Sequence, residues 1–151
     1  MSTDKLQVTM VPTSHIDQVW PRIKGYMEDA AKYTYGRYEV EDIYDAVVKH
    51  NHVLWIAFYG PDIKAAVVTN ILYYPKKTCL SGVFLGGVEL ETWKEPMLEL
   101  LQKWAFDNNC DGFELCGRIG WSKALREQGY QALWQTCELP VATSGLGAQN
   151  G

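Results

Sequence analysis

The segment GGVELETWKEP, residues 86–96, brings two glycines to the predicted start of a helix. Glycines at such a place can hold a phosphate group, because the backbone N–H groups of a helix N-terminus are unpaired and the helix dipole attracts an anion. The same segment carries three glutamates and one lysine, Lys94. Each carboxylate beside a bound phosphate repels it by about 1 kcal/mol or more at surface dielectric. We therefore expect Thr92 and Glu95 to cap this helix in a capping box.

A second candidate is a carboxylate inside an apolar strand. In GFELCG, residues 112–117, alternation directs the large apolar side chains to one face and Glu114 to the other. A semi-buried carboxylate has a raised pKa and can act as a general base. Proteins also tolerate a buried carboxylate by pairing it, so the alternative is a structural ion pair with a cation such as Arg118 or Arg126.

Three tyrosines lie in the polar connection AKYTYGRYEVED: Tyr33, Tyr35 and Tyr38. Tyrosine is enriched in interfaces, so these side chains could line a substrate site or form a protein-binding surface. Plain packing against the core is the alternative.

Composition excludes several classes of function. The chain has 151 residues, 47% of them apolar, and a formal net charge of -4, which argues against nucleic acid as the main partner. No apolar run is long enough to span a membrane, and the first residues, MSTDKLQV, do not have the pattern of a signal peptide. The four cysteines form no CxxC pair, so we predict free thiols and no metal site, and the missing signal pattern predicts a cytoplasmic location.

These residues must be positioned by a fold that alternates strands and helices. Strand patterns cover residues 6–11, 53–59, 63–73, 78–85, 112–117 and 130–139. Helix patterns begin near His15 and then cover residues 40–50, 93–109 and 121–128, the last one ended by Gly129. Short turn sequences join the second to fourth strands into an antiparallel meander. We predict one domain over residues 1–139 and a flexible tail over residues 140–151.

The order of these elements resembles the GNAT superfamily of acyl-CoA-dependent N-acyltransferases. MLELLQKWAFDNNCDGFELCGR, residues 97–118, resembles the long helix, the W-A-x-x-x-G-C turn and the fifth strand of that family. WSKALREQGY, residues 121–130, resembles the next helix, which closes on Gly-Phe. The pattern GRIGWSKALREQGY also resembles divergent GNAT-like proteins of tailed phages. The resemblance implies an α/β (α+β) fold with a central, mostly antiparallel sheet that is flanked by helices and splayed between strands 4 and 5.

In this family acyl-CoA inserts into the splay, and its pyrophosphate lies on a loop with the pattern Arg/Gln-x-x-Gly-x-Gly/Ala. The resemblance places that loop at residues 89–94, with Thr92 and Lys94 in the two glycine positions. Neither residue allows the close backbone approach that glycine allows. Trp93 between them could stack or dock on a partner, and a hydrophobic staple is the simpler alternative.

The resemblance also suggests roles at the end of the fourth strand. Gly86 and Gly87 would relax that strand and leave the Leu85 amide free to polarise an acyl carbonyl. The alternative is a bulge and an exit turn that bind nothing.

Many family members protonate the leaving thiolate with a tyrosine four residues before the closing glycine. Leu125 occupies that position here, so Tyr130, Tyr73 or Tyr74 would have to supply the proton. Glu114 would be the base that takes a proton from an amine acceptor.

Two functions follow. Because the phosphate loop and the acid both depart from the family pattern, the sequence favours a GNAT-fold protein with a degenerate acyl-CoA site. Such a protein would be a non-catalytic structural, assembly or docking component, for example of a phage particle, with a protein partner or self-assembly. The alternative is a divergent N-acetyltransferase that moves an acetyl group from acetyl-CoA to a small-molecule amine. A docking protein would fill the splay with side chains such as Phe84 or Trp93.

Overall fold

The computed structural model describes residues 5–117 and 123–141. The chain divides into two units, Met1–Arg118 and Ile119–Gly151, which are described separately below. The expected single domain over residues 1–139 and the flexible tail after it stay predictions.

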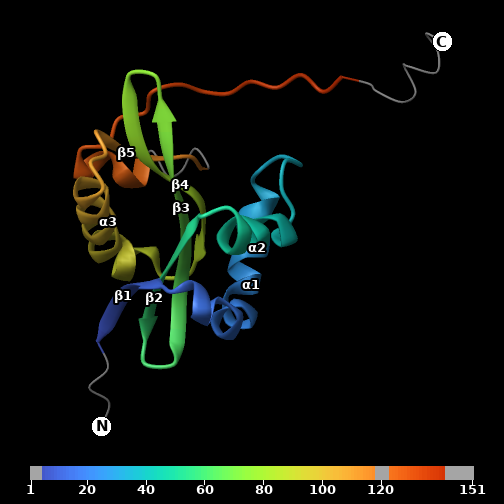
Figure 1. Cartoon of the computed structure of the whole chain (residues 1–151), viewed down its shortest axis with the longest axis vertical. Helices are drawn as coiled ribbons and strands as arrows, with labels where there is room; N and C mark the ends of the chain where they lie inside the picture. The colour runs from blue at the N-terminus through green and yellow to red at the C-terminus, as the bar shows by residue number, and fades with distance from the viewer. Residues whose placement is uncertain (1–4, 118–122, 142–151) are drawn as a thin grey trace, which may run out of the picture. The chain divides into compact units, whose positions relative to one another are not determined.

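The first unit is built on a five-stranded sheet whose strands lie side by side in chain order (Figure 1). The strands are β1 (Leu6–Val11), β2 (Val53–Tyr59), β3 (Asp62–Tyr74), β4 (Lys77–Gly87) and β5 (Gly112–Leu115). Neighbours from β1 to β4 are antiparallel, and β5 runs parallel to β4. The predicted mixed α/β fold with a mostly antiparallel sheet is confirmed. Tight hairpins explain the meander, because Gly60 has a φ of 49° at the β2–β3 turn, a conformation that glycine adopts without strain.

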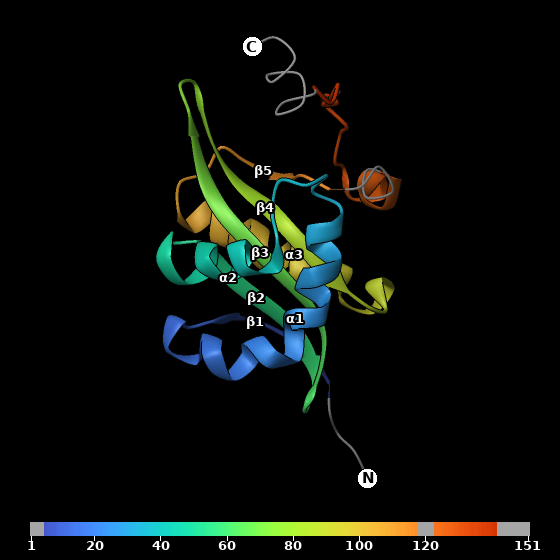
Figure 2. The ribbon, with the colours of Figure 1, turned by 90° about the vertical axis from the view of Figure 1, so that its right-hand side faces the viewer.

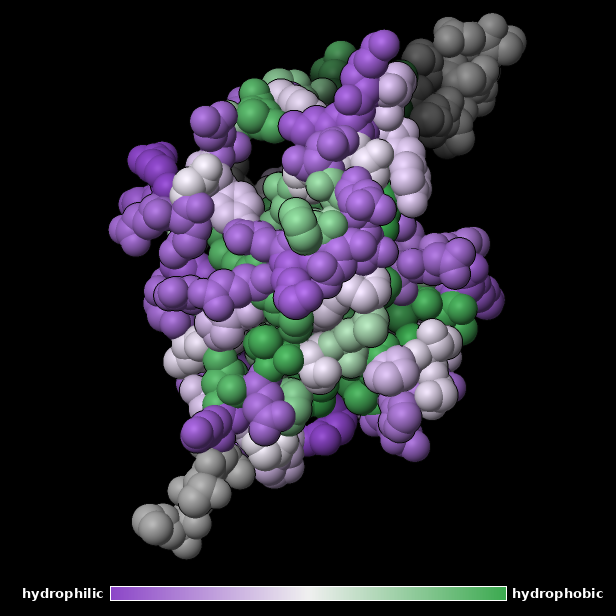
Figure 3. Space-filling view, turned by 60° about the vertical axis from the view of Figure 1, so that its left-hand side comes forward, coloured by the Kyte–Doolittle hydropathy of each residue, from purple (hydrophilic) through white to green (hydrophobic). Residues whose placement is uncertain are grey.

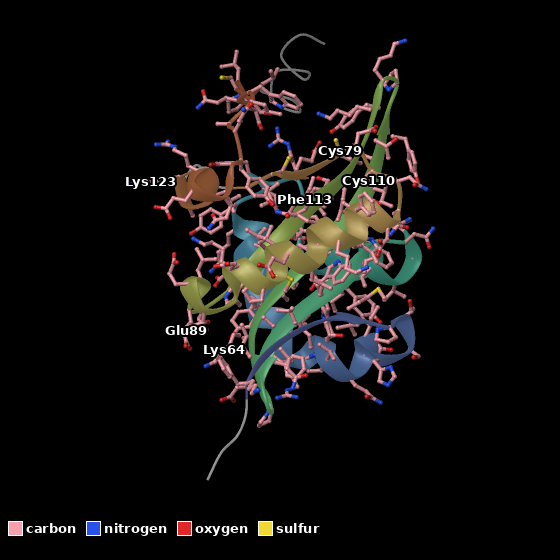
Figure 4. The ribbon with its side chains drawn as sticks, turned by 90° about the vertical axis from the view of Figure 1, so that its left-hand side faces the viewer. Lys64, Cys79, Glu89, Cys110, Phe113 and Lys123 are labelled. Atoms are coloured by element: carbon pink, nitrogen blue, oxygen red, sulfur yellow. The ribbon has the colours of Figure 1, made fainter. Side chains whose placement is uncertain are left out.

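Helices cover both faces of the sheet. The helices are α1 (Ile16–Lys32), preceded by the 3-10 turn η1 (Thr13–His15), α2 (Val40–Lys49) and α3 (Leu90–Asp107). Figure 2 shows α1 and α2 on one face, and Figure 4, seen from the opposite side, shows α3 on the other. The apolar stripe of each helix faces the core: Ile23 and Met27 on α1 and Ile43 on α2 are fully buried. On the α3 face the rings of Trp55 and Trp104 meet edge to face, with centroids 5.4 Å apart, within the usual range for such pairs.

The outer face of α3 is polar. Glu91, Glu99, Gln102 and Lys103 are exposed, and Figure 3 shows a largely hydrophilic surface on the side of the molecule that carries this helix. The exposed polar stripe and the buried stripe of Met97 explain why this segment forms an amphipathic helix.

The start of α3 differs from the expectation. The helix begins at Leu90 instead of Trp93, and its N-cap is Glu89 in the left-handed conformation, without a side-chain cap hydrogen bond. The Thr92 hydroxyl donates to the Glu89 carbonyl at 2.7 Å, within the first turn. The predicted capping box of Thr92 and Glu95 is therefore wrong. Trp93 is only 3% exposed and lies in the first turn of the helix instead of at its start.

The second unit contains a short helical segment. Residues 123–125 are helical, the 3-10 turn η2 (Arg126–Gln128) follows, and Gly129 ends it with a φ of 89°. The predicted end of this helix at Gly129 is confirmed, and residues 121 and 122 lie outside the described residues.

The predicted last strand, residues 130–139, is wrong for this chain. Residues 130–141 belong to no strand in the described structure. Alternating apolar residues produce a strand only where a second strand pairs with them and a core covers one face. Neither condition can be read from the pattern of this segment alone.

Candidate functional site

The sheet opens between β4 and β5. β5 pairs with β4 only from Cys79 to Gly82, and the last bond is donated by the Cys116 amide to the Gly82 carbonyl at 3.1 Å. β4 continues to Gly87, and among the described strands only β3 pairs with this second half of β4. One edge of β4 is thus left open beyond Gly82.

A β-bulge marks the point where the strands separate. Val68 pairs with Phe84 and the next residue, Thr69, pairs with Gly82, so Val83 is an extra residue on β4. A bulge bends its strand and increases the local twist, which turns the second half of β4 away from the line of β5. The bulge lies before the glycine pair and not at it.

The Leu85 amide points to the open edge. The Val88 amide donates to the Lys64 carbonyl at 2.8 Å, so Lys64 and Val88 are a hydrogen-bonded pair. Such pairs alternate along an antiparallel ladder, so Leu85, which lies opposite Val67, directs its N–H and C=O away from β3. This orientation is the one that the expected carbonyl-polarising role requires, and the role itself stays a prediction.

Gly86 and Gly87 allow close packing of the backbone. A Cβ atom on Gly86 would lie 2.2 Å from the Tyr26 carbonyl oxygen of α1, and one on Gly87 would lie 2.5 Å from the Lys64 carbonyl oxygen. Both residues stay in register with β3, so they form no exit turn. The glycines bring α1 and β3 against the end of β4 and keep the Leu85 backbone in place.

The start of α3 forms its own ion pairs. Lys64 on β3 contacts Glu89 at 2.8 Å, and Figure 4 shows both side chains at the same corner of the molecule. The hydrogen bond to Glu89 raises the pKa of Lys64. Lys94 contacts Glu91 at 3.4 Å and is 8% exposed. The two lysines that could bind an anion at this helix start are therefore paired with Glu89 and Glu91.

Trp93 anchors the same turn to the core. Its indole nitrogen donates to the Val88 carbonyl at 2.9 Å. Three of the six residues expected to contact a cofactor lie in this turn: Thr92 uses its hydroxyl within the turn, whereas Trp93 and Lys94 are buried. Their cofactor role stays a prediction.

Glu114 is held by hydroxyl groups from two other strands. The Tyr74 hydroxyl donates to its two carboxylate oxygens at 3.0 and 3.2 Å, and the Ser81 hydroxyl donates to Oε2 at 3.3 Å. The hydrogen bond from Tyr74 to Glu114 raises the pKa of the Tyr74 phenol, which therefore keeps its proton at neutral pH. Of the two cations expected to pair with Glu114, Arg118 lies outside the described residues and Arg126 belongs to the second unit, so the ion pair stays a prediction. The carboxylate is half-buried and oriented, as a base needs to be.

Cys79 lies on the same face of β4 as Ser81, since the two positions differ by two residues. Burial, followed by the charge of Glu114, raises the pKa of the Cys79 thiol. The Cys79 thiol therefore stays protonated and uncharged beside Glu114, and it is a poor nucleophile.

The tyrosine connection reaches β4 through one member. The Tyr38 ring meets the buried Phe84 ring edge to face, with centroids 5.0 Å apart. Phe84 directly follows the bulge residue, so Tyr38 lies beside the point where the strands separate. Tyr33 and Tyr35 are 46% and 78% exposed. Tyr130 belongs to the second unit, where it is half-buried.

Sequence reasoning missed Ser81 and named Tyr74 only as a replacement acid. Strand pairing identifies both residues. Ser81 lies opposite Glu114, and Tyr74 is the last residue of β3, at the hairpin to β4. A hydroxyl in the middle of an apolar strand was the signal available for Ser81.

Neither a metal cluster nor a membrane span is found in the part of the chain that the structure describes. No three histidine, cysteine or acidic side chains gather there as metal ligands, and none of its helices is long and apolar enough to cross a bilayer.

No family model and no curated protein sequence matches the chain. Solved structures match over nearly all of it. The aminoglycoside N-acetyltransferase AAC(6')-Iy, in complex with CoA, has a TM-score of 0.69 at 8% identity, covering 94% of this chain and 98% of that one. This protein has the fold of the GNAT acetyltransferases. The ribosomal-protein-alanine N-acetyltransferase of Brucella melitensis biovar Abortus 2308 has a TM-score of 0.65 at 10% identity, covering 91% and 100%.

A third solved GNAT structure carries an acceptor. The aminoglycoside acetyltransferase meta-AAC0020 from an uncultured soil metagenomic sample, in complex with sisomicin, has a TM-score of 0.61 at 12% identity, covering 92% of this chain and 97% of that one. At these identities the likeness shows the fold. The predicted GNAT-like architecture is therefore confirmed, and the resemblance to phage proteins has no support among these structures.

Proposed function

We propose that the protein is an N-acyltransferase that moves an acyl group from an acyl-CoA thioester to an amine. The observation that carries this proposal is the open edge of β4, where the Leu85 amide is directed away from β3 beyond the bulge at Val83. An N–H group at such a place can stabilise the oxyanion that forms when a carbonyl carbon is attacked. The GNAT fold of the chain supports the same reaction class.

The chain's own groups supply two parts of the reaction. Leu85 N–H donates to the acyl oxygen. Glu114 lies opposite Ser81, four residues before Leu85 on β4, which is about 13 Å along the strand. Its carboxylate takes a proton from the substrate ammonium through a chain of waters, and the neutral amine then attacks. The amine nitrogen forms a bond to the acyl carbon, the carbon–sulfur bond breaks, and the thiolate leaves with a proton for which Tyr130 is the predicted donor. Tyr74 and Ser81 keep the Glu114 carboxylate oriented toward one face of β5.

A second function is favoured by a different observation. Glu89 and Glu91 hold Lys64 and Lys94 at the helix start, and this pairing opposes a bound pyrophosphate. A GNAT-fold protein without a usable acyl-CoA site would act by docking on a protein partner. Phe84 is buried in the α1 and α2 core and Trp93 is buried on the α3 turn. Filling of the splay by these side chains therefore stays a prediction.

Calorimetric titration with acetyl-CoA at low salt separates the two functions. Desulfo-CoA reports binding without a transferable acyl group, and ATP controls for adventitious phosphate binding. Saturable one-to-one binding of acetyl-CoA and desulfo-CoA, but not of ATP, supports the acyltransferase. No heat at millimolar ligand contradicts it and leaves the docking protein.

If acetyl-CoA binds, an activity assay tests the role of Glu114. Amine acceptors are drawn from the classes named by the structural neighbours, aminoglycosides and ribosomal-protein alanine. We expect Glu114→Gln to lower kcat by roughly 10²- to 10⁴-fold, the usual contribution of a general base. Glu99→Gln, an exposed change on α3, is the matched control and should keep full activity. Equal kcat values for both variants would remove Glu114 from the mechanism.

A further inference from the structure

The Glu114 carboxylate has only uncharged partners among the residues that the structure describes. The hydroxyl groups of Tyr74 and Ser81 donate to it at 3.0, 3.2 and 3.3 Å. Burial, followed by the charge of Glu114, raises the pKa of the neighbouring Cys79 thiol, which stays uncharged. The Lys77 ammonium lies over the start of β5, yet no described cation forms an ion pair with Glu114. A carboxylate that is held in one orientation and keeps its charge favours a cationic ligand.

The Glu114 side chain lies on the sheet face that α1 and α2 cover. Val68 on β3 belongs to the buried cluster of that face, and Asn70, two residues later, points the same way. Asn70 lies opposite Ser81, and Ser81 lies opposite Glu114. Residues that lie opposite each other on neighbouring strands share a face of the sheet. Glu114 is therefore on the α1 and α2 face, at the level of Ser81, and every group used here belongs to the first unit.

The same face is apolar along β4 between Ser81 and Leu85. The Phe84 ring belongs to the buried cluster under α1 and α2, and the bulge residue Val83 packs against that cluster. The Tyr38 ring meets the Phe84 ring edge to face, with centroids 5.0 Å apart. A ligand that extends along this face from the Leu85 amide to the level of Ser81 therefore needs an apolar middle part.

Strand geometry sets the distance between the two ends of this path. Leu85 lies four residues after Ser81 and the bulge at Val83 shortens the path, so the ends are roughly 10–13 Å apart. An extended carbon chain with an amine at each end covers this distance with about nine bonds, because each bond of about 1.5 Å advances a zigzag chain by less than its own length.

We propose that the acceptor is a long diamine: one amine is acylated at the Leu85 amide, and the second, as an ammonium ion, binds the Glu114 carboxylate. The apolar chain between them lies along Phe84 and Tyr38. The reacting nitrogen gains the acyl group and loses a proton, CoA leaves as the thiol, and the second ammonium keeps its protons. This inference rests on the proposed acyl transfer and names the substrate class for the same site.

Anchoring an ammonium is compatible with the proton transfer proposed for Glu114. A carboxylate has about four positions at which it accepts a hydrogen bond, so an ammonium can occupy one while the water chain reaches another. Both roles are lost in Glu114→Gln, but they affect different quantities. Loss of the base slows every amine acceptor, whereas loss of the anchor removes only the advantage of a diamine over a monoamine.

The first test compares acceptors in the acetyl-transfer assay. Diaminooctane has an amine at each end, aminooctanol replaces one amine by a hydroxyl group at the same length, and diaminopropane is too short to reach both sites. After correction for its two amines, diaminooctane should exceed both others in kcat/KM by about tenfold or more, the value of one charge-assisted hydrogen bond. Glu114→Gln should remove this preference, and Glu99→Gln, an exposed change on α3, should keep it.

The ratio between acceptors separates this inference from the proposed function. Acetyl transfer at equal kcat/KM to diaminooctane and aminooctanol would overturn the diamine alone, as would a preference that persists in Glu114→Gln. No transfer to any amine, together with no binding of acetyl-CoA, would overturn the acyltransferase and the diamine with it. The comparison of acceptors on the unchanged protein holds even where the Glu114→Gln variant fails to fold.

The second test measures binding without a reaction. Diaminooctane and aminooctanol are titrated by calorimetry into protein that is saturated with desulfo-CoA, which carries no transferable acyl group. We expect diaminooctane to bind with a Kd about tenfold lower or more, and the difference to vanish in Glu114→Gln. A purely catalytic Glu114 would leave the two Kd values equal in the unchanged protein, which would overturn the proposal.

Discussion

The absence of a side chain at Gly86 allows α1 to pack closely against the end of β4, beside the candidate site. Its Cα approaches the Tyr26 carbonyl so closely that no Cβ fits, and this contact brings α1 against the end of β4. The Tyr26 hydroxyl donates to the Ile63 carbonyl at 2.7 Å and ties the same part of α1 to β3. The sequence marked the glycine, but its partner lies on a helix 60 residues earlier.

Gly86→Ala should destabilise the protein. The added methyl group meets a backbone carbonyl, which cannot move without shifting α1, so we expect a loss of about 1–3 kcal/mol of unfolding free energy. Gly25→Ala is the matched control, because nothing lies within 4 Å of its Cβ position and alanine favours the helix by about 0.5–1 kcal/mol. Urea unfolding followed by circular dichroism measures both. Equal midpoints for the two variants would contradict the close contact.

At the scale of elements, the first turn of α3 decides between the two proposed functions. Its backbone N–H groups and dipole favour an anion, whereas Glu89 and Glu91 repel one and hold nearby lysines. The pairing of Lys64 with Glu89 joins β3 to α3, which are far apart in the chain. The acidic character of the turn was visible in the sequence, but the pairing across strands was not.

Replacing both glutamates should strengthen binding of acetyl-CoA if the protein is an acyltransferase. Glu89→Gln and Glu91→Gln remove about 1 kcal/mol of repulsion each and release Lys64 and Lys94 toward the phosphate, so the Kd should fall by roughly fivefold per substitution. Calorimetry at low salt measures the change, and Glu99→Gln controls for the less negative net charge. An unchanged Kd in the double variant would show that the pyrophosphate does not approach this turn.

At the scale of the whole molecule, the chain carries its main core before residue 118. The buried cluster on the α1 and α2 face takes its members from residues 11–84, and α3 buries the other face. The second unit follows from Ile119. If residues 1–139 form the single domain that the sequence predicts, the two units should unfold together.

A chain cut after Gly117 should still fold, because none of the residues in that core cluster is removed. We expect a cooperative thermal transition and retained far-UV circular dichroism, with a modest loss of stability. A chain cut after Val141 serves as the control for shortening. Loss of the cooperative transition only in the shorter chain would instead confirm one domain that extends to residue 139.

Local patterns predicted most of the elements correctly. Alternation and turn residues identified β1 to β5, and helical spacing identified α1 to α3 within a few residues, because these elements bury one face each in the same core. Glu114 was identified as a semi-buried carboxylate for the same reason, since its strand is otherwise apolar. The family pattern at α3 and β5 then sufficed to predict the GNAT fold.

Pairing between distant segments decided everything else. The bulge at Val83, the direction of the Leu85 amide and the hydroxyl groups around Glu114 depend on strand register, which no local pattern records. Residues 130–139 have the alternation of a strand and form none, because a strand needs a partner as well as a sequence. The residue types were thus readable from the chain, whereas their partners were set by which strands lie side by side.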